Sequence, residues 1–172
     1  MSIIKLMTDD YNKVDDLERV INYVLRNREQ DEECVFWTGL GVNTDSVENV
    51  ISDMRTVKRF HNKTDGKQLW HLVVNIYRYK SVQSRKEYLA KRETEFSYCR
   101  LIGYDVCSLL FNKGFQNVFA IHEDSEYLHL HFVINSVSYI NGNHIRNAFS
   151  FEKELQSYLK DNYQNLKWRS KW

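Results

Sequence analysis

Hydrophobic residues follow two different spacings along the chain. Runs dense in Val, Ile and aromatic residues predict strands at residues 2–7, 34–40, 68–79, 117–123 and 128–140. Apolar residues three and four apart predict helices at 14–26, 47–60, 85–111 and 151–159, with Gly103 as a candidate break in the third. The last two strands are too close for a crossover helix and must form an antiparallel hairpin. This order predicts an α+β fold: a largely antiparallel central sheet with flanking helices.

The hairpin carries three of the six histidines of the chain, within the segment IHEDSEYLHLHFVIN (residues 121–135). Side chains alternate across a strand, so Leu128, Leu130, Phe132 and Ile134 should share one face. The opposite face would hold His129, His131, Val133 and Asn135. We expect helices to cover the Leu/Phe face and the histidine face to be the open side of the sheet.

A turn between Glu123 and Leu128 would bring His122 opposite His129 or His131. Three imidazoles on one side of an ion leave its other positions open, as in a catalytic metal site. Such ligands suit Zn, Cu, Ni, Fe or Mn, and Asp124 could orient one of the rings. The alternative is that these histidines are ordinary surface or core residues.

The first predicted helix offers a candidate nucleophile. Its apolar stripe consists of Val14, Leu17, Val20, Ile21, Val24 and Leu25. Tyr23 projects off this stripe between Arg19 and Arg26, where the guanidinium groups could offset the charge of a phosphate. The alternative is a partly exposed tyrosine that packs over a neighbouring loop.

Composition limits the class of protein. The chain has 172 residues with 42% hydrophobic and 27% charged residues, which fits one globular domain. It has no apolar run long enough to span a membrane and no signal peptide, so we expect a cytoplasmic protein.

The three cysteines, Cys34, Cys99 and Cys107, predict buried free thiols. The net charge is only +1, but residues 78–92 form a basic segment that is either a DNA-binding patch or a solvated helix face.

The segment HEDSEYLHLHFVINSVSYINGNHIR resembles the third motif of conjugative relaxases, mobilisation proteins of the HUH endonuclease superfamily. The shared pattern is His-x-Asp, a short turn, His-x-His, and then Asn four residues later. INYVLRN is similar to their N-terminal tyrosine motif, and residues 38–77 are similar to the loop, helix and strand that follow it. The similarity extends over most of the chain and is closest to relaxases of Gram-positive plasmids and integrative elements.

The resemblance implies the HUH-endonuclease fold and site-specific nicking and religation of single-stranded DNA at an origin of transfer. It implies that His122, His129 and His131 bind Mg²⁺ or Mn²⁺, which Zn²⁺ or Ni²⁺ could replace in a crystal. Tyr23 would form a 5′-phosphotyrosyl intermediate, with Asp124 as its base or as a partner of a histidine. The chain would be a single relaxase domain, or the catalytic domain of a longer protein.

The implied partners are single-stranded DNA, relaxosome accessory proteins and a coupling protein, with no membrane association and a monomeric state. The residues expected to contact DNA are Arg19, Arg26, Lys58, Arg59, Lys63, Lys67, His71, Asn75, Arg78, Lys80 and Asn135. One departure is that the family's second motif usually reads His, a few apolar residues, then Ser-Phe. Here His71 matches, but Asn75 and Ile76 replace Ser-Phe.

Three alternatives remain open. A rolling-circle replication initiator shares the chemistry, but its tyrosine usually lies after the histidine motif, where Tyr158 and Tyr163 are the candidates. A DNA-binding or replication-accessory module would have kept the fold without catalysis. A metal-bound hydroxide would hydrolyse DNA without any protein–DNA adduct.

Overall fold

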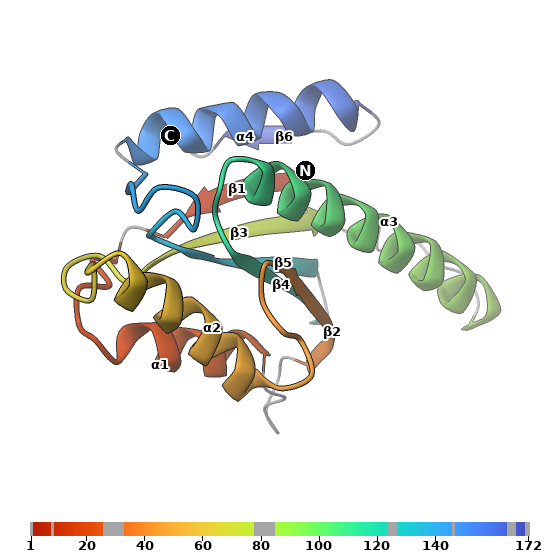
Figure 1. The fold of residues 1–172 in the computed structure, drawn as a ribbon. Helices are drawn as coiled ribbons and strands as arrows, with labels where there is room; N and C mark the ends of the chain where they lie inside the picture. The colour runs from red at the N-terminus through yellow and green to blue at the C-terminus, as the bar shows by residue number, and fades with distance from the viewer. Residues whose placement is uncertain are drawn as a thin grey trace.

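The computed structural model describes residues 2–7, 9–25, 33–77, 85–123, 127–145, 147–164 and 168–170. Figure 1 shows the arrangement of their helices and strands. In chain order the elements are β1 (Ser2–Leu6), α1 (Asp16–Leu25), β2 (Glu33–Leu40), α2 (Val47–Phe60), β3 (Leu69–Tyr77), α3 (Arg85–Asn112), β4 (Asn117–Glu123), β5 (Tyr127–Asn135), α4 (Ala148–Asn162) and β6 (Trp168–Ser170). The predicted α+β class and the hairpin of the last two long strands are confirmed.

The strands form one sheet in the order β2-β4-β5-β3-β1-β6. All pairings are antiparallel except that of β1 with β6, which is parallel. β4 and β5 therefore lie in the middle of the sheet, with β2 on one side and β3 on the other. The histidine hairpin occupies this centre, so its side chains are held by neighbours on both sides.

The Leu/Phe face of the sheet is covered by α3 and α4, as predicted. Phe119 and Phe132 stack on this face with ring centroids 5.8 Å apart. Gly103 does not break α3, which is continuous from Arg85 to Asn112. A Cβ atom at Gly103 would lie 2.2 Å from the Phe119 ring, so glycine is needed here for close contact between helix and sheet.

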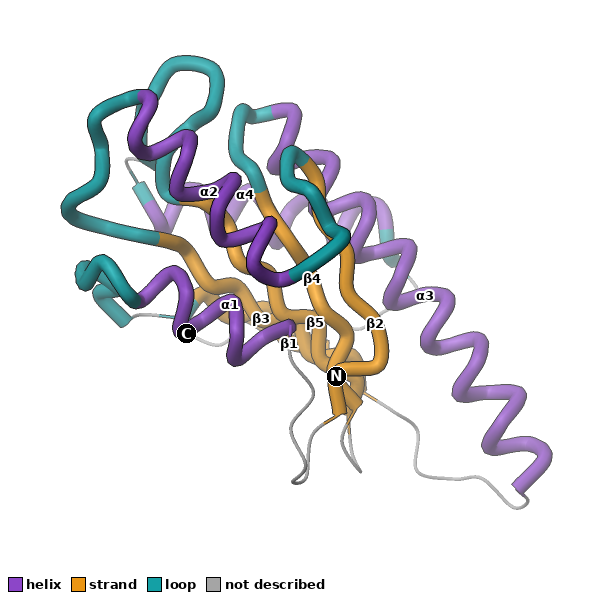
Figure 2. Tube along the Cα trace, turned by 60° about the horizontal axis from the view of Figure 1, so that its bottom comes forward, coloured by secondary structure: helices purple, strands orange, loops and turns teal. Residues whose placement is uncertain are grey.

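The prediction that the histidine face is open is wrong. α1 and α2 pack across it, and their buried side chains form a second core with Leu69, Val118, Ala120 and Val133 of the sheet. The physical reason is that both helices have an apolar stripe that must be buried, and the far end of the histidine face is apolar. The result is three layers, with helices on both sides of the sheet (Figure 2).

The ends of several elements differ from the predictions. Val14 precedes α1 and is 62% exposed, so it is not part of the buried stripe. α1 begins at Asp16, whose carboxylate accepts a hydrogen bond from the Lys13 amide at 2.9 Å. β5 ends at Asn135 rather than at residue 140, and the short strand β6 was not predicted.

The three cysteines are free thiols, as predicted; Cys99 and Cys107 are buried, while Cys34 is half-buried. Among the helices that the structure describes, none combines the length and the apolar character needed to cross a membrane.

Candidate active site

Backbone register brings the histidines of the hairpin together. His122 on β4 pairs directly with His129 on β5, one of the two pairings that the hairpin prediction allowed. The rings of His122 and His131 are 4.5 Å apart between centroids, and those of His129 and His131 are 6.2 Å apart. His122 and His131 are buried, whereas His129 is half-buried. The cluster therefore has a buried side beneath α1 and a more accessible side at His129.

Two hydrogen bonds hold the buried rings. Nε2 of His122 lies 2.7 Å from the carbonyl oxygen of Val24, in the last turn of α1. A carbonyl can only accept, so this nitrogen carries the proton. Nδ1 of His131 lies 3.0 Å from Nε2 of His71 on β3, while Nε2 of His131 is buried and has no hydrogen-bond partner among the described residues.

His71 is the cluster member that spacing along the sequence could not identify, because it lies on a different strand. Burial lowers its pKa to about 4. Burial also lowers the pKa of His131, and the neighbouring rings of His122, His71 and His129 lower it further. Both imidazoles are therefore neutral near pH 7, which is the form in which histidine binds metals.

Tyr23 reaches the same cluster from α1. Its ring stands edge-on to that of His131, with the centroids 6.2 Å apart and the planes at 75°. The prediction that Tyr23 lies off the apolar stripe is confirmed, because Leu17, Val20, Ile21, Val24 and Leu25 are buried and Tyr23 is half-buried. Residues about a hundred positions apart in the sequence thus bring a tyrosine ring against a histidine cluster.

The chemistry of these donors fits a metal ion, because His131 presents a buried and unsatisfied Nε2 beside two further imidazoles. The arrangement of the side chains is not that of a formed site. Across the described parts of the chain, no group of three or more His, Cys, Asp or Glu side chains is placed to hold a metal. Asp124, which was predicted to assist, lies outside the described residues.

A family model described as the nuclease domain of MobA/VirD2-like relaxases matches residues 23–167. The chain belongs to this relaxase family. The match begins at Tyr23 and includes the whole histidine hairpin. Neither the curated proteins nor the solved structures contain a significant match to the chain. The closer similarity to relaxases of Gram-positive elements stays a prediction.

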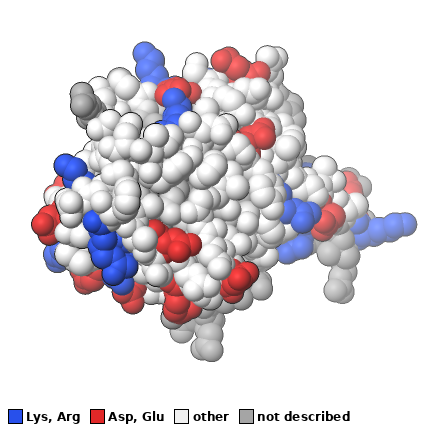
Figure 3. Space-filling model, in the orientation of Figure 1, with Lys and Arg blue, Asp and Glu red and all other residues white. Residues whose placement is uncertain are grey.

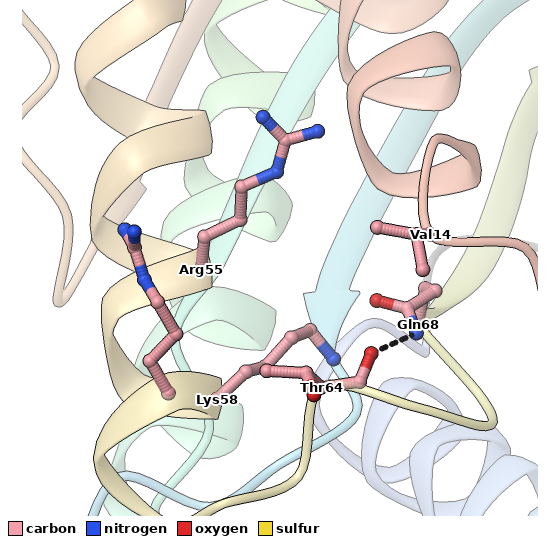
Figure 4. Close-up of a pocket in the computed structure, with 6 residues that line it drawn as sticks. Val14, Arg55, Lys58, Thr64 and Gln68 are labelled. Carbon is pink, nitrogen blue, oxygen red and sulfur yellow. Dashed lines mark hydrogen bonds between the residues drawn. The ribbon is translucent and has the colours of Figure 1, made fainter.

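The relaxase has a second polar region at the other end of the same layer. A pocket of about 150 Å³ lies beside the last turns of α2 and is lined by Val14, Arg55, Lys58, Arg59, Thr64 and Gln68 (Figure 4). Lys58 and Gln68 point toward Thr64, whereas Arg55 points away from this centre.

Lys58 is the unusual member of this pocket, because it is only 2% exposed. Its Nζ donates to the hydroxyl of Ser136 at 2.7 Å, and that hydroxyl in turn donates to the Lys67 carbonyl. Burial lowers the pKa of Lys58 to about 8, and no carboxylate among the described residues forms an ion pair with it. The buried ammonium group therefore relies on a hydroxyl where a counter-ion would be expected.

Other predicted DNA contacts are arranged differently. Arg59 and Lys63 are exposed near the pocket. Arg19 is bound to Asp16 at 2.6 Å. Lys67 donates to the Asp9 carbonyl at 2.7 Å, and its Nζ lies 4.4 Å from the centre of the Trp70 ring. Over the α1 and α2 layer, positive and negative side chains lie side by side (Figure 3).

Two amide side chains differ in their suitability for contact with a ligand. Asn75 pairs with His129 in the β3–β5 register, and its Oδ1 has no hydrogen-bond partner among the described residues. Asn135 is fully buried and donates to the Met54 carbonyl and to Gln116 Oε1 at 3.0 and 2.9 Å, so it acts inside the fold. Arg26, Arg78 and Lys80 lie outside the described residues.

Proposed function

We propose that this relaxase nicks and rejoins single-stranded DNA at an origin of transfer, with Tyr23 as the nucleophile. The observation that carries the proposal is the contact between Tyr23 and His131, with ring centroids 6.2 Å apart. The buried face of α1 is made by its aliphatic stripe, and Tyr23 lies at the edge of this core, half-buried. A tyrosine beside a cluster of imidazoles is suited to phosphoryl transfer.

In the proposed reaction, the Tyr23 oxygen attacks the scissile phosphorus and the bond from phosphorus to the 3′ oxygen breaks. The tyrosine proton leaves through a base, and the departing 3′ oxygen takes up a proton to become a hydroxyl. The 5′ phosphate stays on the tyrosine as an ester. Because one ester replaces another, attack by a 3′-hydroxyl reverses the step and rejoins the strand without an external energy source.

Relaxases of this family generally use a divalent metal, and we assign the ligands to His122, His129 and His131. Mg²⁺ or Mn²⁺ would stabilise the negative charge that develops on the phosphate oxygens. The chain's own contribution is to keep His131 neutral and to fix the His122 ring against the Val24 carbonyl. Asp124 remains a proposed base or histidine partner.

For the DNA strand, we propose that phosphates contact Arg59, Lys63 and the pocket containing Lys58. These cations lie at the end of the α2 layer, away from the histidine cluster. Basic side chains at this position would hold the backbone of the strand while Tyr23 acts on it. Contacts with accessory and coupling proteins would use other surfaces of this domain.

The rolling-circle alternative needs Tyr158 or Tyr163 at the histidines. Both pack with the core on the Leu/Phe face, so the sheet separates them from the cluster. Tyr163 is buried and donates to Asp105, and burial together with this carboxylate raises its pKa far above the ordinary value. A buried tyrosine that resists ionisation on the wrong face is a poor nucleophile for this site.

The test is covalent capture of DNA. The protein with Mn²⁺ is incubated with a random-sequence single-stranded library labelled at the 3′ end, and adducts are isolated on a denaturing gel. We expect an adduct with the native protein and none with Tyr23→Phe, a loss of at least ~10³-fold for a nucleophile. Tyr104→Phe, at an exposed tyrosine of α3, is the matched control and should form the adduct normally.

Three outcomes would contradict the proposal. An adduct in the Tyr23→Phe protein would assign the nucleophile elsewhere. Cleavage of the DNA without any adduct would favour attack by a metal-bound hydroxide. Binding without cleavage or adduct across the whole library would indicate a DNA-binding module.

A further inference from the structure

We propose that Asp9 and Tyr11 are positioning residues, which act through His71 to keep Nε2 of His131 free of a proton and directed to the reaction site. The inference rests on the proposed role of His131 as a metal ligand. It concerns two residues before α1 that no motif of the sequence identifies. It also explains why a row of hydrogen-bonded polar side chains leads into the buried side of the histidine cluster.

The four side chains form a continuous line of hydrogen bonds. The Tyr11 hydroxyl lies 3.1 Å from Oδ2 of Asp9 and 3.4 Å from Nδ1 of His71. Nε2 of His71 lies 3.0 Å from Nδ1 of His131. The line ends at Nε2 of His131, which no described residue satisfies.

The carboxylate at the start of the line determines the direction of every proton in it. An ionised Asp9 can only accept, so Tyr11 donates to it and its oxygen accepts from Nδ1–H of His71. A neutral imidazole has one N–H, so Nε2 of His71 must accept from Nδ1–H of His131. The remaining nitrogen of His131 then carries a lone pair, as a metal ligand requires.

Without the carboxylate, the line can reverse. Tyr11 would donate to Nδ1 of His71, which would donate from Nε2 to Nδ1 of His131. His131 would then carry its proton on Nε2, where it would block metal binding. Asp9 therefore selects between two proton arrangements that have the same heavy-atom geometry.

The backbone around Tyr11 is held in an unusual conformation. Tyr11 is buried with a φ of 47°, in the left-handed region that costs a non-glycine residue about 1–3 kcal/mol. Its carbonyl accepts from the Gln68 amide at 2.8 Å, and the Asp9 carbonyl accepts from Lys67 Nζ at 2.7 Å. The entry to β3 thus fixes this loop and places the hydroxyl against His71.

Burial and Asp9 raise the pKa of Tyr11 to about 12, so its hydroxyl keeps its proton at the pH of the reaction. A purely structural network would also satisfy these groups. The two roles differ in one measurable property, because only the positioning role requires one defined tautomer of His131 that depends on Tyr11.

The test is ¹⁵N–¹H NMR of the imidazole rings in the metal-free protein without DNA. We expect native His131 to be protonated at Nδ1 alone, and Tyr11→Phe to give a substantial fraction protonated at Nε2. Mn²⁺ affinity measured by calorimetry should fall about 10–100-fold, as expected when a hydrogen-bond partner of a ligand is removed. The signals of His131 are assigned with a His131→Gln protein.

Tyr139→Phe is the matched control, because it also removes one hydroxyl hydrogen bond, to the Phe111 carbonyl, but lies outside the cluster. It should leave the His131 tautomer unchanged. Asp9→Ala removes the exposed carboxylate without touching the core, and it should shift the tautomer in the same direction as Tyr11→Phe.

The inference is overturned if native His131 is protonated at Nε2, or if neither Tyr11→Phe nor Asp9→Ala changes its tautomer. The NMR measurement that decides this outcome uses neither metal nor DNA, so it is separate from the test of nicking. A protein with the expected tautomer that forms no DNA adduct would overturn the proposed function alone.

Discussion

The histidine cluster and the Lys58 pocket lie toward opposite ends of one helix-covered sheet face, and each contains a buried nitrogen base. Ser136, the partner of Lys58, follows His131 by five residues, roughly 17 Å along an extended chain. Burial lowers the pKa of His131, and its Nε2 has no hydrogen-bond partner among the described residues, which would suit a cation. Among the described residues, Lys58 donates to the Ser136 hydroxyl and forms no ion pair, which would suit an anion. Under the proposed function, the fold separates a region for the metal and the chemistry from a region for phosphate binding.

The largest expected effect comes from the histidine end. His131→Ala removes the buried Nε2, and we expect the rate of adduct formation to fall about 10²–10³-fold, in the range for loss of one charge-stabilising group. Affinity for a single-stranded oligonucleotide, measured by fluorescence anisotropy, should change less than about threefold. His144→Ala is the control, because His144 lies near Lys58 and Lys63 rather than in the cluster. If the rate of adduct formation fell equally in His131→Ala and His144→Ala, the histidine cluster would have no special role in catalysis.

The next effect concerns the charge of Lys58. Its pKa is about 8 in the folded protein against an ordinary value of 10.5, so the unfolded chain binds more protons between these two pH values. Stability therefore rises as the pH increases through this range and the buried charge is lost. We expect the unfolding free energy of the native protein, relative to Lys58→Met, to increase by about 3 kcal/mol from pH 8 to 10.5.

Urea unfolding of both proteins across this range measures the difference, and other titrating groups cancel between them. A flat difference would mean that water or a counter-ion already compensates Lys58. The pocket would then not need an anion.

The smallest effect is expected at the exposed cations. Lys63→Gln should weaken single-stranded DNA binding by about tenfold at low salt, without regard to sequence. In a plot of the logarithm of affinity against the logarithm of salt concentration, the slope should become less steep by about 1, because one phosphate contact is lost. Lys153 is exposed on α4, in the other helical layer. Its replacement, Lys153→Gln, should leave binding unchanged. A similar loss in Lys153→Gln would place the DNA on the other face.

The sequence predicted local features best. Alternation in β5 and a short turn were enough to place His122 opposite His129 or His131, because a hairpin needs no long-range contact. The structure pairs His122 with His129. The same argument separated the Leu/Phe face from the histidine face. The off-stripe position of Tyr23 followed from helical periodicity, although its contact with His131 depends on how α1 packs on the sheet.

Features that depend on packing between distant segments were missed. The histidine face was expected to be open because of its polar residues. The rest of that face is apolar, with Val118, Ala120 and Val133, and α1 and α2 cover it. Lys58 was expected to contact DNA, yet its side chain is buried against Ser136, which directly follows β5. No periodic pattern could have indicated that Tyr11, in a loop with positive φ, would contact His71.

The most direct test of the central claim is mass spectrometry of the adducted protein after digestion with trypsin and nuclease. Cleavage at Arg and Lys separates the candidate tyrosines, with Tyr23 in peptide 20–26, Tyr158 in peptide 154–160 and Tyr163 in peptide 161–167. We predict a nucleotide phosphate on peptide 20–26, attached to Tyr23. A nucleotide on either of the other two peptides would contradict the assignment of this histidine face as the active site.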